Sequence, residues 1–565
     1  MKKTVFVSLI LLLTFSSCGL LGIHFKVHNP KKPGKSLKYS KEEILLGELT
    51  QYRTCYDVNY YDFSLTVDPD KKTLDGVVQI HATAQVDFDT LQLDLHSNFE
   101  ITKLIDKTTN KELMFERNER AVFVHSPRKN GDSFILQISY NGQPVKAKKA
   151  PWKGGFVWEK DDEKNPWIGV ACESDGASLW WPLKDHTSDE ADSVRLHYTV
   201  PQGLTAVGNG QFEGETKKGD QSTFNWFVSY PINSYNVTIY VGKFRHFNDQ
   251  YTGINGETLE LDHYVLEKNY FAAKKHFEQL HPILKSFEEL FGEYPWYRDG
   301  FKLVESPYAG MEHQTAIAYG NGYRNNGDNE TDYIILHETA HEWWGNSVTV
   351  KDLADVWIQE GFATYAEALY YEKKKGTDAY NSQLSWNRIM IKNKYPVVSQ
   401  KDRRCFHFRR NSDVYGKGAW ILHSLRCQLE DDSLFFDIIK SFYSEFKYQI
   451  VETKDFTDLV NTKTGSDYSW FFDQYLMSNF VPELDYAYTP EGLVYYRWSN
   501  VSESYNQLKI SALIKGEKIT LIPSAEVQHL DLPKNNSGTW SFSFSPSSVL
   551  YALNENSKLL KEVKK

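Results

Sequence analysis

The spacing of hydrophobic residues changes twice along the chain. Between about residues 60 and 247, apolar and polar residues alternate in short runs, as in 63–67 and 77–82, and turn residues such as Asn141-Gly142 separate the runs. Alternation with frequent turns is typical of antiparallel strands that bury one face. We therefore predict an antiparallel β domain over residues 44–247.

From Asn269 onward the apolar residues fall three and four positions apart, which indicates amphipathic helices. The first includes Phe277, Leu284 and Phe291, and others are expected at 330–347, 355–375, 379–393, 415–430, 433–446 and 455–477. Alternation returns after Phe480, as in 492–498 and 508–513. We predict a mainly helical domain over 248–480 and a small C-terminal β-sandwich domain over 481–565, so the fold class is multidomain α+β.

The first residues have the sequence features of an export signal. Two lysines precede an apolar run over 5–13, and Ser16-Ser17 lead into Cys18. We expect a signal peptide over 1–17. The stretch 14–18 resembles a bacterial lipoprotein signal, although Phe15 stands where leucine is more usual. That likeness implies a lipidated Cys18, a tether over 18–43 and a place in the bacterial cell envelope, facing the periplasm or the surface. The alternative is an ordinary signal peptide with an incidental cysteine.

Composition narrows the choice of partners. The chain has 565 residues, 41% of them hydrophobic, which suffices for large cores, and a net charge of −10. An acidic protein is a poor general binder of nucleic acid, because phosphates are met by lysine and arginine. The cysteines after Cys18 (55, 172, 405 and 427) are too scattered for a disulfide framework, and we expect most to be buried thiols.

One short motif carries metal chemistry. His337-Glu338 and His341 form a His-Glu-x-x-His sequence inside a predicted helix. Residues four apart on a helix are separated by about 40° around its axis, so both imidazoles project together and make half of a zinc site. Glu338, beside His337, lies where it can reach a water molecule at the metal.

A third ligand follows at a distance that suits a second helix. Glu360 comes after 18 intervening residues, within Trp-Ile-Gln-Glu-Gly-Phe-Ala. Two histidines and one glutamate hold one zinc ion and leave one position open, as in hydrolytic zinc sites. The alternative is a pair of helices that bind no metal, with histidines in the core and glutamates on the surface.

These motifs resemble the gluzincin aminopeptidases typified by aminopeptidase N. Besides the zinc motif, Ala309-Gly310-Met311-Glu312-His313 is similar to that family's Gly-Ala-Met-Glu-Asn, with His313 in place of the usual asparagine. Tyr415-Gly416-Lys417-Gly418 is similar to its Tyr-x-Lys-Gly. The resemblance covers nearly the whole chain after residue 43 and implies a thermolysin-like zinc domain, in a short form without the family's large C-terminal helical domain.

The resemblance also implies roles. Glu312 would bind the α-ammonium of a peptide, helped by Glu173 of the first domain, and Gly310 and Met311 would line the cleft. Tyr415 would stabilise the oxyanion, and Glu338 would act as general base and then acid.

Two further expectations rest on position. Glu367, seven residues after Glu360 on the same helical face, is expected to orient a ligand histidine. Trp343 and Trp344, beside the zinc motif, are expected to wall the cleft.

The sequence thus predicts a zinc-dependent aminopeptidase that takes peptides with a free N-terminus and is held to a membrane by a lipid. Two alternatives stay open: a zinc endopeptidase on the same metal site, and a noncatalytic peptide-binding protein. A side activity such as epoxide hydrolysis, known in one branch of the family, has no support in these residues.

Overall fold

The structure is a computed structural model. It describes residues 29, 38–326, 330–404, 411–502, 505, 508–534, 540–545 and 547–563. Cys18 and the predicted signal peptide lie outside the described residues. Within them, no helix has both the length and the apolar character needed to cross a membrane. Cys55, Cys172 and Cys427 are free thiols, the first two buried, and Cys405 lies outside the described part.

The N-terminal part begins with two short helices, α1 (Lys41–Gly47) and α2 (Gln51–Thr54). Ser40 caps α1 in a capping box with Glu43, so a helix begins inside the stretch predicted as tether. The strands that follow are β1 (Tyr56–Asp68), β2 (Thr73–Ala84), β3 (Phe88–Asp94), β4 (Phe99–Asp106), β5 (Lys111–Glu112), β6 (Phe115–Asn118), β7 (Ala121–Arg128), β8 (Ser133–Gly142), β9 (Gly155–Lys160), β10 (Pro166–Ala171), β11 (Glu190–Ala191), β12 (Ser193–Pro201), β13 (Thr205–Val207), β14 (Gln211–Lys218), β15 (Gln221–Val228), β16 (Ile232–Asn233) and β17 (Tyr240–Gly242).

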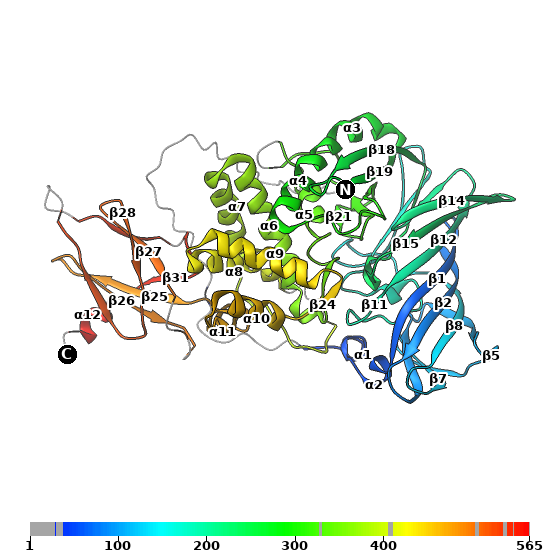
Figure 1. Cartoon of the computed structure of the whole chain (residues 1–565), viewed down its shortest axis with the longest axis horizontal. Helices are drawn as coiled ribbons and strands as arrows, with labels where there is room; N and C mark the ends of the chain where they lie inside the picture. The colour runs from blue at the N-terminus through cyan, green and yellow to red at the C-terminus, as the bar shows by residue number, and fades with distance from the viewer. Residues whose placement is uncertain are drawn as a thin grey trace, which may run out of the picture.

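An eight-stranded sheet, in the order β14-β15-β12-β1-β2-β8-β4-β5, dominates this part (Figure 1). Buried and less buried residues alternate along most of β1, as the apolar pattern predicts. Among the described strands of this sheet, only β1 and β12 pair in parallel. Between β1 and β12 the chain adds β2, β4, β5 and β8 to the large sheet and also forms β9 and β10 of a smaller sheet, β13-β17-β10-β9.

The middle part, predicted to be helical, opens with a sheet and not with a helix. Its strands run in the order β18-β19-β20-β22-β21. The predicted boundary between residues 247 and 248 falls inside β18. The core of the N-terminal part extends onto this sheet through Val304, Met311 and Ala318, so the two parts share a packed interface. The elements are β18 (Phe244–Thr252), β19 (Thr258–Leu266), β20 (Leu303–Glu305), β21 (Gly310–Met311), β22 (Ile317–Tyr319), α3 (Tyr270–His276), α4 (Leu280–Phe291) and α5 (Tyr333–Ala340).

Helices form the rest of the middle part, together with one short pair of parallel strands. The helix expected over 455–477 is two helices, because Gly465 adopts a left-handed conformation that ends the first. The elements are β23 (Val348–Val350), β24 (Gln449–Val451), α6 (Trp357–Lys375), α7 (Thr377–Met390), α8 (Asp413–Leu429), α9 (Asp432–Phe446), α10 (Thr453–Thr464) and α11 (Ser469–Leu476).

Two sheets make up the C-terminal part, in the orders β29-β26-β25-β31 and β28-β27-β30. Tyr486 of the first sheet and Phe544 of the second are in ring contact, with centroids 5.3 Å apart, so the sheets face each other as in a sandwich. Figure 1 shows this part at the opposite end of the molecule from the large N-terminal sheet, beyond the helices. The elements are β25 (Glu483–Tyr488), β26 (Leu493–Ser499), β27 (Ile510–Ile514), β28 (Glu517–Leu521), β29 (Gln528–Asp531), β30 (Phe542–Ser545), β31 (Ala552–Glu555) and α12 (Leu559–Glu562).

Candidate active site

Helix α5 carries the two histidines and is fixed at its start. Asp332 caps it by accepting a hydrogen bond from the Ile334 N–H at 2.9 Å. His276 and the hydroxyl of Tyr319 contact the other carboxylate oxygen of Asp332 at 2.9 and 2.7 Å. These contacts tie the metal-binding helix to α3 and to β22.

The helix is shorter than the predicted 330–347. It ends at Ala340, and a turn follows, in which the N–H of Trp343 bonds to the carbonyl of Ala340. Gly345, at φ +119°, then turns the chain into β23. His341 is the C-cap residue and keeps helical backbone angles, so its side chain still projects beside that of His337.

Helices α6 and α8 cross each other through a glycine contact. A Cβ on Gly361 of α6 would lie 2.9 Å from the Cα of Gly418 in α8. Only residues without side chains allow two helix backbones to come this close. The crossing brings Glu360 of α6 to the histidines and brings Tyr415 of α8 over His337, with ring centroids 6.1 Å apart.

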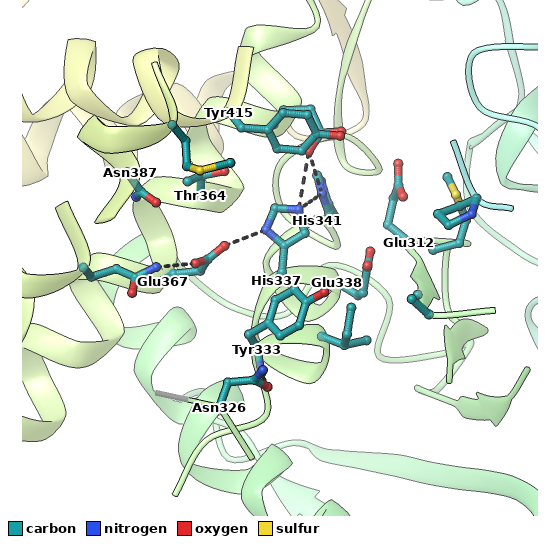
Figure 2. Close-up of a pocket in the computed structure, with 18 of the residues that line it drawn as sticks. Glu312, Asn326, Tyr333, His337, Glu338, His341, Thr364, Glu367, Asn387 and Tyr415 are labelled. Atoms are coloured by element: carbon teal, nitrogen blue, oxygen red, sulfur yellow. Dashed lines mark hydrogen bonds and ion pairs between the residues drawn. The ribbon is translucent and has the colours of Figure 1, made fainter. Parts of the chain in front are cut away.

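Three ligand atoms converge between these helices. The Nε2 atoms of His337 and His341 lie 3.1 Å apart, and each is 3.4 Å from Oε2 of Glu360. The Nδ1 atoms bond elsewhere: that of His337 to Glu367 at 2.8 Å (Figure 2), and that of His341 to the Trp344 carbonyl at 2.8 Å. Those outer bonds place the protons on Nδ1 and leave both Nε2 lone pairs facing Glu360.

This arrangement fits a zinc ion. Oε2 of Glu360 is buried and has no hydrogen-bond partner within the described chain, and the three ligand atoms lie within 4.8 Å of one another. Two imidazole nitrogens and a carboxylate oxygen that point at one spot require a cation, and this donor set is the one that zinc hydrolases use.

Glu338 lies beside the triad, against strand β21. A Cβ on Gly310 would come within 2.5 Å of its Oε1, so a larger residue here would displace the carboxyl group of Glu338. Burial raises the pKa of Glu338 to about 8, and the nearby Glu312 adds to the rise. A carboxyl group that gains and releases a proton near neutral pH suits general acid–base chemistry.

Two further carboxylates face the triad from its other side. Glu312 follows β21, is 4% exposed and accepts a hydrogen bond from the Tyr235 hydroxyl at 3.1 Å. Glu173 follows β10 in the N-terminal part, and its Oε1 is buried without a hydrogen-bond partner in the described chain. Burial, then the charges of Glu312 and Glu360, raise the pKa of Glu173 well above its ordinary value. The site therefore concentrates negative charge where the two parts meet.

A cavity of about 880 Å³ joins these groups. The ten site residues predicted within the described chain all line it, whereas the eleventh, Cys18, is not described. The ten are Glu173, Gly310, Met311, Glu312, His337, Glu338, His341, Glu360, Glu367 and Tyr415. The structure thus brings them to one place, although their chemical roles stay predictions.

Two departures from expectation concern aromatic and histidine side chains. Trp343 and Trp344 do not wall the cleft: both are fully buried behind α5, where Trp344 stacks on Phe442 of α9. His313, the residue that departs from the family motif, is also fully buried, and the Tyr240 hydroxyl lies 2.7 Å from its Nδ1. His313 therefore lies behind strand β21 and does not line the cavity.

Sequence reasoning missed several residues that the cavity includes. Thr364, four residues after Glu360 on α6, could have been found from helical spacing. Trp152 of the N-terminal part and Gln383, Trp386 and Met390 of α7 line the cavity without any motif. Nothing in the sequence indicates that they lie near the metal ligands.

Comparisons with known proteins agree with this geometry. The profile of the peptidase family M1 domain matches residues 276–475, and that of the peptidase M1 N-terminal domain matches residues 57–235. Together they cover about two thirds of the chain.

Curated relatives are longer than this chain. The leucyl aminopeptidase of Saccharolobus solfataricus is 23% identical over 399 residues, which are 64% of this chain and 46% of that protein. The probable aminopeptidase 2 of Sulfurisphaera tokodaii is 22% identical over 75% of this chain and 55% of its own length. The chain thus spans about half the length of these two relatives.

A solved structure has the same fold. The M1 zinc metallopeptidase of Deinococcus radiodurans superposes with a TM-score of 0.63 at 22% identity, over 77% of this chain and 96% of that one. A mutant of the same enzyme was solved with a Tyr-Ser-Ala substrate, and it aligns with a TM-score of 0.62 at 21% identity over 74% of this chain and 94% of that one. With both domain profiles matched in order, and with the family's zinc-ligand motif assembled in space, this chain is a member of peptidase family M1.

Proposed function

We propose that this protein is a zinc-dependent aminopeptidase, which removes N-terminal residues from peptides. The observation that carries the proposal is the position of Glu312: a ligand oxygen of Glu312, one of Glu338 and a ring nitrogen of His341 lie within 4.8 Å of one another. A carboxylate this close to the metal ligands and to the base can hold the α-ammonium of a substrate one residue from the bond to be cut.

The proposed chemistry divides among four residues and the metal. His337, His341 and Glu360 would hold zinc, which polarises a carbonyl and makes a water molecule more acidic when bound. Glu338 takes a proton from the attacking water and passes it to the leaving nitrogen. The hydroxyl of Tyr415 donates a hydrogen bond to the carbonyl oxygen as negative charge develops on it.

The crowding of carboxylates supports an exopeptidase over an endopeptidase. The nearby Glu312 raises the pKa of Glu173, whose buried Oε1 has no hydrogen-bond partner in the described structure. A positive α-ammonium between them would satisfy both, whereas an internal peptide segment brings no charge.

Peptides with free and acetylated N-termini test the proposal. The purified protein is expected to cleave the free peptides one residue at a time, to leave the acetylated ones intact, and to lose activity when a chelator removes zinc. Equal cleavage of both peptide sets would instead indicate an endopeptidase. Activity that survives complete removal of the metal would rule out the zinc mechanism.

We also propose that the protein is exported and held to a membrane of the bacterial envelope by a lipid on Cys18. The support is the sequence of residues 1–18 alone. Expression of Cys18→Ala in a bacterium that processes lipoproteins is expected to move the protein from the membrane fraction to the soluble fraction. Retention in the membrane fraction would contradict the proposal.

A further inference from the structure

One face of helix α7 borders the catalytic cavity. Gln383, Trp386, Asn387 and Met390 are spaced three, four and seven residues apart, so they form a stripe along one side of the helix, and all four line the cavity. The stripe is anchored to the metal centre, because Gln383 donates a hydrogen bond to Glu367 at 2.7 Å and Glu367 in turn contacts His337.

The outer part of this stripe is apolar and exposed. Trp386 is 61% exposed and Met390 is 46% exposed, although each could have packed on the neighbouring helices. We call these two side chains the α7 platform. Across the cavity, Trp152 of the N-terminal part is 48% exposed. Large apolar side chains that face each other over a cavity indicate a place where apolar groups bind.

The positions of the site residues define the direction in which a bound peptide would run. Figure 2 shows Glu312 on one side of His337 and His341, and Glu367 and Asn387 of α6 and α7 on the other. If Glu312 holds the substrate's amine, the chain beyond the cleaved bond must leave on the opposite side. That side leads to the α7 platform, which is continuous with the metal site through the same cavity.

We infer that the α7 platform binds the side chains beyond the scissile bond and selects peptides with apolar residues there. This inference rests on the proposed aminopeptidase function and adds a substrate class to it. Apolar side chains of the substrate would cover Trp386 and Met390, so water leaves both surfaces, and a ring of Trp386 can also stack on an aromatic residue. Polar side chains at these positions would gain nothing from the platform.

The chain offers a matched control. Ile389 adjoins Met390 on α7 and is equally exposed, at 46%, but it does not line the cavity. The experiment compares the wild type with Trp386→Ala, Met390→Ala and Ile389→Ala. The substrates are tetrapeptides that share their first residue and carry either leucine or phenylalanine, or serine, at the second and third. The amide of the same first amino acid carries only an NH₂ group beyond the scissile bond, so it ends before the platform.

The wild type is expected to prefer the apolar tetrapeptides in kcat/KM. In Trp386→Ala this preference falls about tenfold, and in Met390→Ala about threefold, since each change removes part of the apolar surface that the peptide covers. Hydrolysis of the amino-acid amide stays within about twofold in all variants, and Ile389→Ala matches the wild type on every substrate.

Two results would overturn the inference. One is a wild type that cleaves the amino-acid amide but shows no preference for apolar tetrapeptides. The other is a Trp386→Ala variant that keeps the wild-type preference. Either would leave the aminopeptidase proposal standing. A wild type that cleaves neither the amide nor any tetrapeptide would contradict the proposed function itself, and the inference would fall with it.

Discussion

The two ends of the catalytic cavity are built in opposite ways. At one end, the charged end, the acidic side chains of Glu312 and Glu173 come from two different parts of the chain. At the other end, the apolar end, Trp386 and Met390 are exposed and come from a single helix. Figure 2 shows His337 and His341 between Glu312 and Asn387 of α7.

The backbone of the charged end is supported by two buried arginines. Arg404 forms a buried ion pair with Asp185 at 2.8 Å and also donates to the carbonyl of Glu173 at 3.4 Å. Arg120 donates to the carbonyl of Asp175, two residues further along, at 2.7 Å. An end that must hold one ammonium needs a rigid frame, whereas an end that accepts varied side chains does not. The difference suggests strict recognition of the amine and graded recognition of the downstream residues.

The largest effect is expected from a change between the two ends. Glu338→Gln should lower kcat about 10³-fold on every substrate, because it removes the proton acceptor without touching a metal ligand. Zinc content, measured by atomic absorption, should equal that of the wild type. Residual activity within tenfold of the wild type would show that another group moves the proton.

A change at the charged end should separate the two ends. Glu312→Gln is expected to lower kcat/KM for free peptides about a hundredfold, since it removes the charge that meets the ammonium. The loss should be the same for apolar and polar tetrapeptides. A loss that depended on the downstream residues would mean that the ends are not independent.

Removing the support of the charged end should give a smaller effect on activity. Arg404→Ala leaves Asp185 buried without its partner, which we expect to cost about 3 kcal/mol of unfolding free energy. The displaced Glu173 should raise KM for free peptides about tenfold while kcat stays near the wild-type value. Denaturant unfolding and steady-state kinetics measure the two, and Arg404→Lys should recover part of both. An unchanged KM in a destabilised variant would limit the arginine to a structural role.

The same ion pair predicts a pH dependence of stability. Burial opposes ionisation of Asp185, but Arg404 and Ser178 outweigh it and lower the pKa of the carboxyl below its ordinary value of about 3.9. The stabilisation is therefore present above the ordinary value and is lost as the pH falls through the lowered one. The stability advantage of the wild type over Asp185→Asn should accordingly shrink in the acid range. A stability difference between the two proteins that does not change with pH would contradict this prediction.

The smallest effect should come from Gln383, which stands on α7 but contacts the metal centre. Gln383→Ala removes one hydrogen bond to Glu367, so kcat/KM should fall about threefold. The fall should be equal for apolar and polar tetrapeptides, in contrast to that in Trp386→Ala. A selective loss on apolar peptides would place Gln383 functionally with the α7 platform.

Within each helix, the placement of the proposed metal ligands could be predicted because the geometry is local. His337 and His341 share one helical turn, and Glu360 and Glu367 share one face of α6, so spacing alone sets the relation within each pair. Glu312, Tyr415 and Glu173 were proposed from a family resemblance, and the structure places all three at the cavity. No spacing rule links them to the histidines.

Contacts between distant segments could not be predicted. Arg404 meets Glu173 across 231 positions, and α7 reaches the cavity only because α6 turns back at Gly376. Hydrophobicity also misleads near the site: Trp343 and Trp344 build the core behind α5, while Trp386 stays exposed in front of it. The sequence alone does not indicate which tryptophan side chains the rest of the fold will bury.

The contact between Gly361 and Gly418 has a consequence for laboratory evolution of this protein. Both residues would place a new Cβ within 3 Å of the other helix. A library that randomises the two positions together and selects for turnover should therefore return glycine at both, whatever substrate is used for selection. Improved variants would have to come from elsewhere, and the α7 platform is the part of the cavity wall that can change without moving these two helices.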